Sequence, residues 1–402
     1  MVQLALFLII AYQISLIAPS PRRPGCSFDL SNLDPEPIII SASDHQFLYP
    51  DPDASEVFLA KGQSIIISCP GGQLTLNSTS IGTTISATCK QGNKFIANGT
   101  TFKLNKITCS TNPYHRASSL KQSCESGGQE IEIGFIVGND SFVREIAICF
   151  DSKYRNPFYS TFNLTRSIAH RESDVIRPTF VEELVYTQLP VRMTDLYLLS
   201  NQRSVINCLL GLPANSTRYI KDSTDYFLVR GHLTAKDDFV YTYQQIATFH
   251  YVNTAPQWQS FNSLNWDAVE SDVRNYAASN KLDLKVYTGI YGVTTLPHAE
   301  TGEDVPLFLF SRYLNAIAVP ELFWKVVYDP VSKKGIALLG INNPYQKDVV
   351  KSIICEDISS FITWLHWKPA DVQAGYSYAC TVDEFRRKVS YLPEFEVSGL
   401  LL

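Results

Sequence analysis

The sequence predicts an α+β protein of two domains, in which a small, disulfide-rich, all-β domain precedes a larger domain of mixed, mostly antiparallel strands and a few helices. Two patterns predict this fold class. Six of the nine cysteines lie between Cys26 and Cys149, in a stretch of short β-branched runs separated by turn residues. After that stretch, strand-like and helical patterns occur together. A chain of 402 residues is too long for one small core, and we place the domains at residues 26–144 and 145–402.

The first domain is predicted to consist of strands joined by tight turns. Residues 64–68 (SIIIS) form a β-branched run between glycine and proline residues. Residues 83–88, 100–107 and 131–137 show a similar alternation, and the Asn98-Gly99 pair is typical of a hairpin turn. These patterns predict strands, and they predict no function for this domain.

The second domain contains one clear helical pattern. Within residues 265–279, apolar side chains recur at spacings of three and four, as on the buried face of an amphipathic helix: Trp266, Val269, Val273 and Ala277. Another helix is predicted over residues 353–366. Strands are predicted over residues 145–150, 158–164, 324–328 and 335–340.

The N-terminus indicates secretion. Residues 4–18 form an apolar run of signal-peptide length that is too short for a comfortable membrane span, although no basic residue precedes it. We predict a signal peptide over approximately residues 1–20 and a secreted mature protein that is not bound to a membrane, with an uncleaved anchor as the alternative. No later stretch is long and apolar enough to cross a bilayer.

Cysteines and glycosylation motifs agree with this location. None of the nine cysteines forms a C-x-x-C pair, so most are expected to form disulfides in an oxidising compartment, and one is left over. Their spacing does not fix the pairing. Five Asn-x-Ser/Thr motifs predict a glycoprotein: Asn77, Asn98, Asn139, Asn163 and Asn215.

The charge restricts the class of partner. The formal net charge is −5, which argues against a protein whose whole surface binds nucleic acid. An enzyme that releases a polyanionic product needs only a local basic patch, so nucleic-acid substrates are not excluded.

A strand near the middle of the chain carries two unusual side chains. In residues 227–239 (FLVRGHLTAKDDF), Arg230 and His232 are two residues apart, so they share one face of an extended strand. Gly231 between them permits close approach of another backbone or side chain. Residues 247–252 are predicted to form a second strand, which leads into Asn253.

Four side chains are spaced four residues apart along the helix that follows. Asn262, Trp266, Glu270 and Arg274 therefore form one slanted stripe. Each has an ordinary interpretation: Asn262 as a helix cap, Trp266 as core, and Glu270 with Arg274 as a surface ion pair. Two strands followed by a helix would suit a compact metal-binding ββα arrangement, whereas hydrolase, zincin and nucleotide-binding signatures are absent.

Taken together, residues 227–276 resemble the DNA/RNA non-specific endonucleases, which have a ββα-metal core. The matching residues are in order and at family spacing: Arg230-Gly231-His232-Leu233, Thr248-Phe249, Asn253-x-Ala255-Pro256-Gln257, Phe261-Asn262, Asn265-Trp266, Glu270 and Arg274. The variant present here is most similar to the arthropod secreted branch, which includes enzymes that digest double-stranded RNA. The resemblance implies a secreted endonuclease of DNA or RNA, in a gut lumen or in saliva, with low sequence specificity.

The resemblance also implies a role for each site residue. His232 would be the general base, Asn262 the direct ligand of Mg²⁺ (with Mn²⁺ as a substitute), and Glu270 the holder of metal-bound water. Arg230 and Arg274 would contact phosphate, and Asn253 would steady the site near His232.

One residue departs from the family pattern. Many members carry aspartate where this chain has Val229, which puts full catalytic strength in doubt. The alternative prediction is therefore a secreted nucleic-acid-binding protein that retains the fold with weak or no catalysis. A purely structural secreted module, a third interpretation, would leave the ordered motif as coincidence.

Overall fold

The computed structural model describes residues 24–30, 33–138 and 141–402. The predicted signal peptide and the motif at Asn139 lie outside the described residues. The fold is α+β, with mostly antiparallel sheets and few helices, as predicted. No helix in the described part of the chain is long and apolar enough to cross a membrane.

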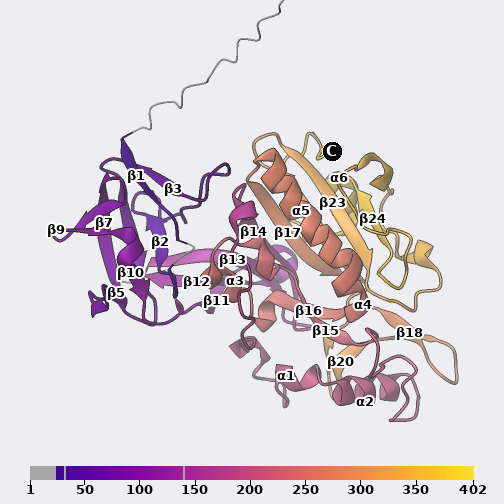
Figure 1. The fold of residues 1–402 in the computed structure, drawn as a ribbon. Helices are drawn as coiled ribbons and strands as arrows, with labels where there is room; N and C mark the ends of the chain where they lie inside the picture. Colours follow the sequence, from indigo (N-terminus) through magenta and orange to yellow (C-terminus); the bar gives the residue numbers. More distant parts are fainter. Residues whose placement is uncertain (1–23, 31–32, 139–140) are drawn as a thin grey trace, which may run out of the picture.

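The N-terminal strands lie to one side of the larger part of the molecule (Figure 1). Five of them form an antiparallel sheet in the order β2-β4-β7-β8-β9, and alternate side chains such as Ile65 and Ile67 are fully buried. The remaining strands form a β1–β3 pair and a three-stranded β10-β5-β6 sheet. The strands are β1 (Gly25–Phe28), β2 (Ile38–Ser41), β3 (Val57–Ala60), β4 (Ser64–Ser68), β5 (Leu74–Leu76), β6 (Thr79–Ser80), β7 (Thr84–Gln91), β8 (Lys94–Ala97), β9 (Thr100–Lys103) and β10 (Ile107–Cys109).

Disulfides hold this region together. Cys26 pairs with Cys89 and Cys69 with Cys109, and each bond joins segments that are distant in sequence. Such cross-links stabilise a small domain mainly by restricting its unfolded state. Further disulfides join Cys124 to Cys149 and Cys355 to Cys380, so Cys208 is the predicted odd cysteine.

A nine-stranded sheet forms the centre of the molecule. Its strand order is β11-β12-β13-β14-β17-β22-β23-β24, with β25 added in parallel to β23. The predicted domain boundary between residues 144 and 145 falls inside β13, so the sheet continues across it. The strands are β11 (Arg116–Ser123), β12 (Gln129–Val137), β13 (Ser141–Asp151), β14 (Asn156–Leu164), β17 (Leu284–Tyr291), β22 (Leu322–Asp329), β23 (Lys334–Ile341), β24 (Ser377–Cys380) and β25 (Gly399–Leu400).

Each face of this sheet packs against different elements. On β22, Phe323 and Lys325 face Trp266 at the start of α5, whereas Trp324 and Val326 join the core that contains Phe385 of α6. Side chains alternate between the faces of a strand, so α5 and α6 cover opposite faces. The helices are α1 (Met193–Leu196), α2 (Leu199–Leu209), α3 (Thr242–Ile246), α4 (Gln259–Phe261), α5 (Asp267–Asn280) and α6 (Val382–Lys388).

Short two-stranded sheets complete the larger part. β15 pairs with β16 beside α5, and the other two pairs lie at the edge of the molecule near α2 (Figure 1). The strands are β15 (Leu228–His232), β16 (Thr254–Trp258), β18 (Thr295–Pro297), β19 (Asp304–Pro306), β20 (Phe308–Ser311) and β21 (Asn315–Ala318).

Two predicted elements are wrong. Residues 353–366 form no α-helix, because Asp357 accepts hydrogen bonds from the backbone and side chain of Ser359, and the Cys355–Cys380 disulfide ties the segment to β24. Residues 247–252 form no strand, and the partner of β15 is instead β16, which begins at Thr254. Pro256 lies within β16, and a two-stranded sheet consists of edge strands, which tolerate proline.

Candidate active site

β15 and β16 present the predicted strand residues as an antiparallel pair. Gly231 lies opposite Ala255, and Arg230 lies opposite Pro256. A Cβ atom on Gly231 would come within 2.3 Å of Gln257 Oε1, and Gln257 is fully buried. Glycine is therefore required for the two strands to pack with Arg230 and His232 on one face.

The helical side of the site contains an irregular turn. A π-helical turn over Asn262–Trp266 joins α4 to α5, and such turns occur frequently at functional sites. The apolar stripe predicted for this helix is buried as expected, which leaves Asn262, Glu270 and Arg274 along one cleft.

That cleft brings together five of the six predicted site residues. It has a volume of about 560 Å³ and is lined by Arg230, His232, Asn262, Glu270 and Arg274. Asn253 does not line it. Sequence reasoning missed several lining residues, namely Arg177, Phe180, Lys236, Asp237 and Asp267.

Arg230 is held by aromatic rings. Its guanidinium carbon lies 4.8 Å from the ring centre of Tyr197 and 5.5 Å from those of Phe180 and Tyr251. Its Nε donates to the hydroxyl of Tyr251 (3.0 Å) and its Nη2 to Thr194 of α1. The Nη1 atom has no hydrogen-bond partner among the described residues, so it remains available to a ligand in the cleft.

His232 has an unpaired ring nitrogen. Its Nε2 atom is buried and has no hydrogen-bond partner in the described structure, and the ring packs against Phe180 and Phe249 at centroid distances of 5.2 and 5.0 Å. Burial, helped by the charge of Arg177, lowers the pKa of His232 to about 3. The imidazole is therefore neutral near pH 7, the form that can accept a proton.

Asn253 holds the chain that follows His232. It is fully buried, and its side chain accepts from Thr234 N (3.0 Å) and donates to the carbonyls of Thr234 and Thr248. Its own carbonyl accepts from Leu233 N. These bonds fix the two residues after His232, so Asn253 acts on the site through the backbone.

Three buried charged residues lie close to Glu270, namely Asp238, Arg274 and Lys325. Arg274 donates to Asp238 (3.0 Å) and to Ser271 (3.0 Å), and it forms no ion pair with Glu270 within 4 Å. Lys325 is 1% exposed and donates to Thr288. Burial raises the pKa of Glu270 to about 7, against the attraction of Lys325.

The missed residues carried little sequence signal. Arg177 and Phe180 lie in an irregular segment with no periodic pattern, some fifty residues before His232. Lys236 and Asp237 follow His232 closely and could have been found by their proximity.

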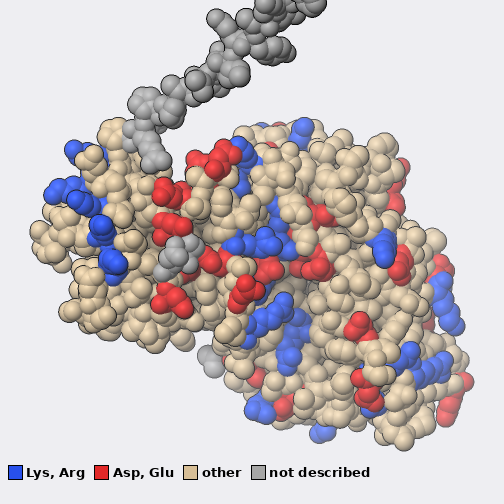
Figure 2. Space-filling view, in the orientation of Figure 1, with Lys and Arg blue, Asp and Glu red and all other residues tan. Residues whose placement is uncertain are grey.

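On the face shown in Figure 2, Lys and Arg side chains gather near the middle of the molecule with Asp and Glu beside them.

The chain belongs to the DNA/RNA non-specific endonuclease family, whose model matches residues 126–385. Members of this family are metal-dependent enzymes that act on nucleic acids. The family match confirms the resemblance stated from residues 227–276, and the protein is an enzyme of this class.

Curated relatives come from arthropods. The chain is 29% identical over 372 residues to "Salivary endonuclease" of Lutzomyia longipalpis, covering 90% of this chain and 82% of the relative. It is 22% identical to "Salivary protein Tsal1" of Glossina morsitans morsitans, covering 84% of this chain and 82% of the relative. It is 23% identical to "Salivary protein Tsal2A" of the same organism, covering 98% of each chain. A solved structure described as "Crystal structure of the EndoG/EndoGI complex: Mechanism of EndoG inhibition" covers 64% of this chain and 87% of that chain, at 16% identity and a TM-score of 0.36, too low to support a structural argument.

Proposed function

We propose that the protein is a secreted, Mg²⁺-dependent endonuclease that hydrolyses DNA and RNA, double-stranded RNA included, with low sequence specificity. The observation that carries the proposal is the neutral imidazole of His232 in a cleft that is also lined by Asn262, Glu270 and Arg230, whose Nη1 is free. A base, oxygen ligands and a cation in one cleft are the parts that phosphodiester hydrolysis needs.

The cleft residues fit a hard divalent cation. Asn262 offers an amide oxygen, and Glu270 and Asp267 offer carboxylates, which are the ligand types that Mg²⁺ takes while keeping several of its waters. We assign Asn262 as the direct ligand, and Glu270 as the residue that accepts hydrogen bonds from metal-bound water. When bound, Mg²⁺, or Mn²⁺ in its place, would supply positive charge for the phosphate and the leaving oxygen.

Proton transfer and phosphate binding are assigned to side chains of the protein. His232 accepts the proton of the attacking water, because its imidazole lines the cleft and is neutral near pH 7. Arg230 donates from Nη1 to a phosphate oxygen, and its aromatic neighbours hold it in place. Arg274 is bonded within the protein, so we assign it to the charge of the cleft wall and to positioning Asp238.

Low sequence specificity follows from what the cleft offers. Its polar side chains suit phosphate, metal and water, and contacts to the phosphate backbone carry no sequence information. The names of the three relatives support secretion into saliva, and the four disulfides agree with passage through an oxidising compartment.

Chelation tests this proposal against the alternative of a nucleic-acid-binding protein. Purified secreted protein would be incubated with double-stranded DNA and double-stranded RNA, with Mg²⁺, with Mn²⁺ or with EDTA, and the products separated on a gel. We expect cleavage of both substrates with either metal and none with EDTA. A mobility shift without cleavage in every condition would establish the binding protein instead, with Val229 as the first residue to examine.

A further inference from the structure

A second cleft crosses the sheet on the face that α5 does not cover. On β17, Lys285 and Tyr287 line this cleft, and they alternate with Thr288, which bonds Lys325 on the α5 side. Side chains two residues apart share a face of a strand and adjacent ones do not. The cleft is therefore separated from the nuclease site by the thickness of the sheet.

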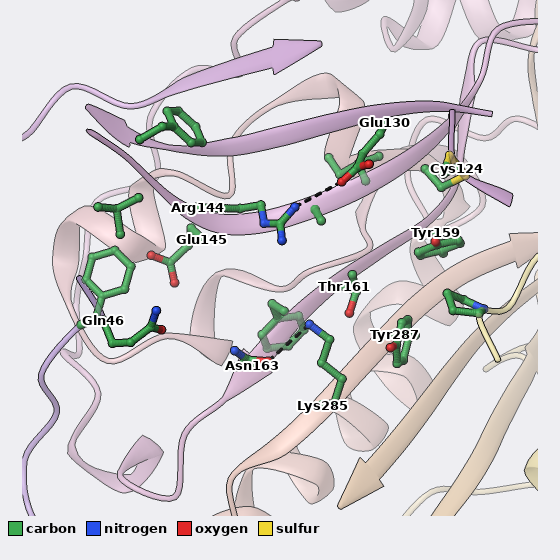
Figure 3. A pocket seen from close by; sticks show the side chains of 18 of the residues that line it. Gln46, Cys124, Glu130, Arg144, Glu145, Tyr159, Thr161, Asn163, Lys285 and Tyr287 are labelled. Atoms are coloured by element: carbon green, nitrogen blue, oxygen red, sulfur yellow. Dashed lines mark hydrogen bonds and ion pairs between the residues drawn. A yellow bond between two sulfur atoms is a disulfide. The ribbon is translucent and has the colours of Figure 1, made fainter. Parts of the chain in front are cut away.

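The cleft is large and has mixed chemistry. Its volume is about 710 Å³, and it continues into a neighbouring hollow of about 720 Å³ that shares Gln46, Arg144, Asn163 and Lys285. Pockets that hold small ligands span about 300–1,000 Å³. Figure 3 shows amide, carboxylate, hydroxyl and cationic side chains pointing into the first cleft, with Tyr159 and Tyr287 along one side.

Asn163 lines both the cleft and its neighbouring hollow. It is an exposed residue of β14, and it begins the motif Asn163-Leu164-Thr165. Its Oδ1 accepts from Lys285 Nζ (3.3 Å), whereas its Nδ2 donates to no other described group. Nδ2 is the atom that carries the sugar in N-glycosylation, so the atom to be modified is free on a residue that lines the cleft.

We propose that Asn163 carries an N-linked glycan whose first sugars lie in this cleft. Nδ2 loses a proton and bonds to the anomeric carbon of a lipid-linked oligosaccharide diphosphate, and the lipid diphosphate departs with that proton. The inference rests on the proposed secretion of the protein and not on its nuclease activity.

The lining suits a sugar better than an apolar ligand. The ring of Tyr287 stacks on Phe395 with an interplanar angle of 10°, which presents a flat aromatic surface at the border of the two hollows. Aromatic faces bind the C–H side of a sugar, and nearby amides and charged groups bind its hydroxyls. Lys285 has no carboxylate within 4 Å among the described residues and donates to Asn163 alone, so it also has donor capacity to spare.

Other motifs provide internal controls. Asn77 and Asn98 occupy exposed turns with φ of 49° and 47°, and neither lines the cleft or its neighbouring hollow. A glycan on either residue would extend into solvent, whereas a glycan on Asn163 would be enclosed at its base by the sheet and by Gln46.

Native-state deglycosylation tests the inference. The full chain would be secreted from a eukaryotic cell line and treated, without denaturant, with a peptide-N-glycosidase, which converts each released asparagine to aspartate. Peptide mass spectrometry would then follow every site over time. We expect a glycan on Asn163 that is released roughly tenfold more slowly than that on Asn98, because release requires local opening, and equal rates after denaturation.

A second variant guards against other causes of slow release. Tyr287→Ser removes the aromatic wall and should bring the release rate at Asn163 close to that at Asn98, while Asn98 itself is unchanged. An unmodified Asn163 beside a modified Asn98 overturns the inference alone, as does equal release from the native protein. A secreted protein with no modified motif also overturns the inference alone, whereas a retained protein with no modified motif overturns it together with the secretion premise. Cleavage of nucleic acid by the same material tests the nuclease separately.

Discussion

At the residue scale, the site depends on how its charged groups are supported. Three aromatic rings surround Arg230 and two surround His232, so their positions are fixed by packing before any ligand binds. Preorganised groups of this kind stabilise developing charge without rearranging during the reaction. The same burial keeps His232 neutral, and raises the pKa of Glu270.

Glu270 should set the acidic limb of the pH profile. Its pKa of about 7 means that the carboxylate we assign to metal-bound water is lost as pH falls through 7, whereas His232 stays neutral down to about pH 3. At low Mg²⁺, kcat/KM should therefore fall about tenfold for each unit below pH 7. Higher Mg²⁺ should move the limb to lower pH. In Glu270→Gln the limb should be absent and the rate low throughout; an unchanged limb in that variant would contradict the assignment.

Gly231 should tolerate no side chain. In Gly231→Ala the new Cβ would lie 2.3 Å from Oε1 and 2.6 Å from Cβ of the fully buried Gln257, so one of the two strands must shift. We expect a loss of about 1–3 kcal/mol in the free energy of unfolding and a larger loss of cleavage, because Arg230 and His232 shift with the strand. Denaturant unfolding and cleavage rates measure the two effects. Gly399→Ala is the control, since its Cβ would meet Lys334 at an ordinary 3.6 Å.

Some site residues could be predicted and others could not. Period-two spacing places Arg230 and His232 on one face, and four-residue spacing places Glu270 near Asn262 and Arg274. Arg177 enters the cleft through tertiary packing of an irregular segment, for which no local rule exists. The partner of Arg274 was also missed, because Asp238 is far from it in sequence and pairs with it only in the folded state.

At the element scale, helices and strands were located correctly where apolar residues recur with clear periodicity, and less well where the pattern is weak. The helix after Asn262 and the strands at β4, β13, β14, β22 and β23 follow from clear spacing of apolar residues. The second strand is predicted over residues 247–252, seven residues before the observed start of β16 at Thr254. In the structure Thr248 belongs to no strand, and its Oγ1 donates a hydrogen bond to Gln245 O near the end of α3.

The contact between β13 and α3 should make stability depend on pH. Glu145 is buried and accepts from Gln244 of α3, and burial raises its pKa to about 8. Its protonated form favours the folded state, so this stability is complete below about pH 4.5 and is lost as pH rises through 8. The melting temperature should fall less between pH 6 and 9 in Glu145→Gln than in the parent protein. An equal fall in both would show that Glu145 is ionised when folded.

At the scale of the whole molecule, one sheet separates two surfaces. The cleft proposed as the nuclease site lies on the α5 side, and the cleft at Asn163 lies on the other. The sequence predicted both the all-β start and the mixed remainder, but strand order depends on long-range pairing that local patterns do not encode. For that reason β11 and β12, which were assigned to the first domain, pair within the central sheet.

A molecule of net charge −5 should still bind its substrate through local charge. Arg177, Arg230 and Lys236 line the cleft, so raising salt from 50 to 200 mM should raise KM steeply. Arg177→Ala should lower the slope of log KM against log salt by about 1, for the loss of one phosphate contact. Arg166→Ala, whose parent side chain pairs with Asp283 outside the cleft, should leave the slope unchanged.

The most direct test of the nuclease assignment is cleavage of double-stranded DNA by His232→Ala in Mg²⁺, beside His45→Ala, which removes an exposed histidine outside the cleft. Thermal unfolding of both variants would establish that each is folded. We predict that His232→Ala loses at least about 100-fold in rate, in the range of a missing general base, while it still binds DNA and His45→Ala cleaves normally. A folded His232→Ala that cleaves at the parent rate would contradict the central claim.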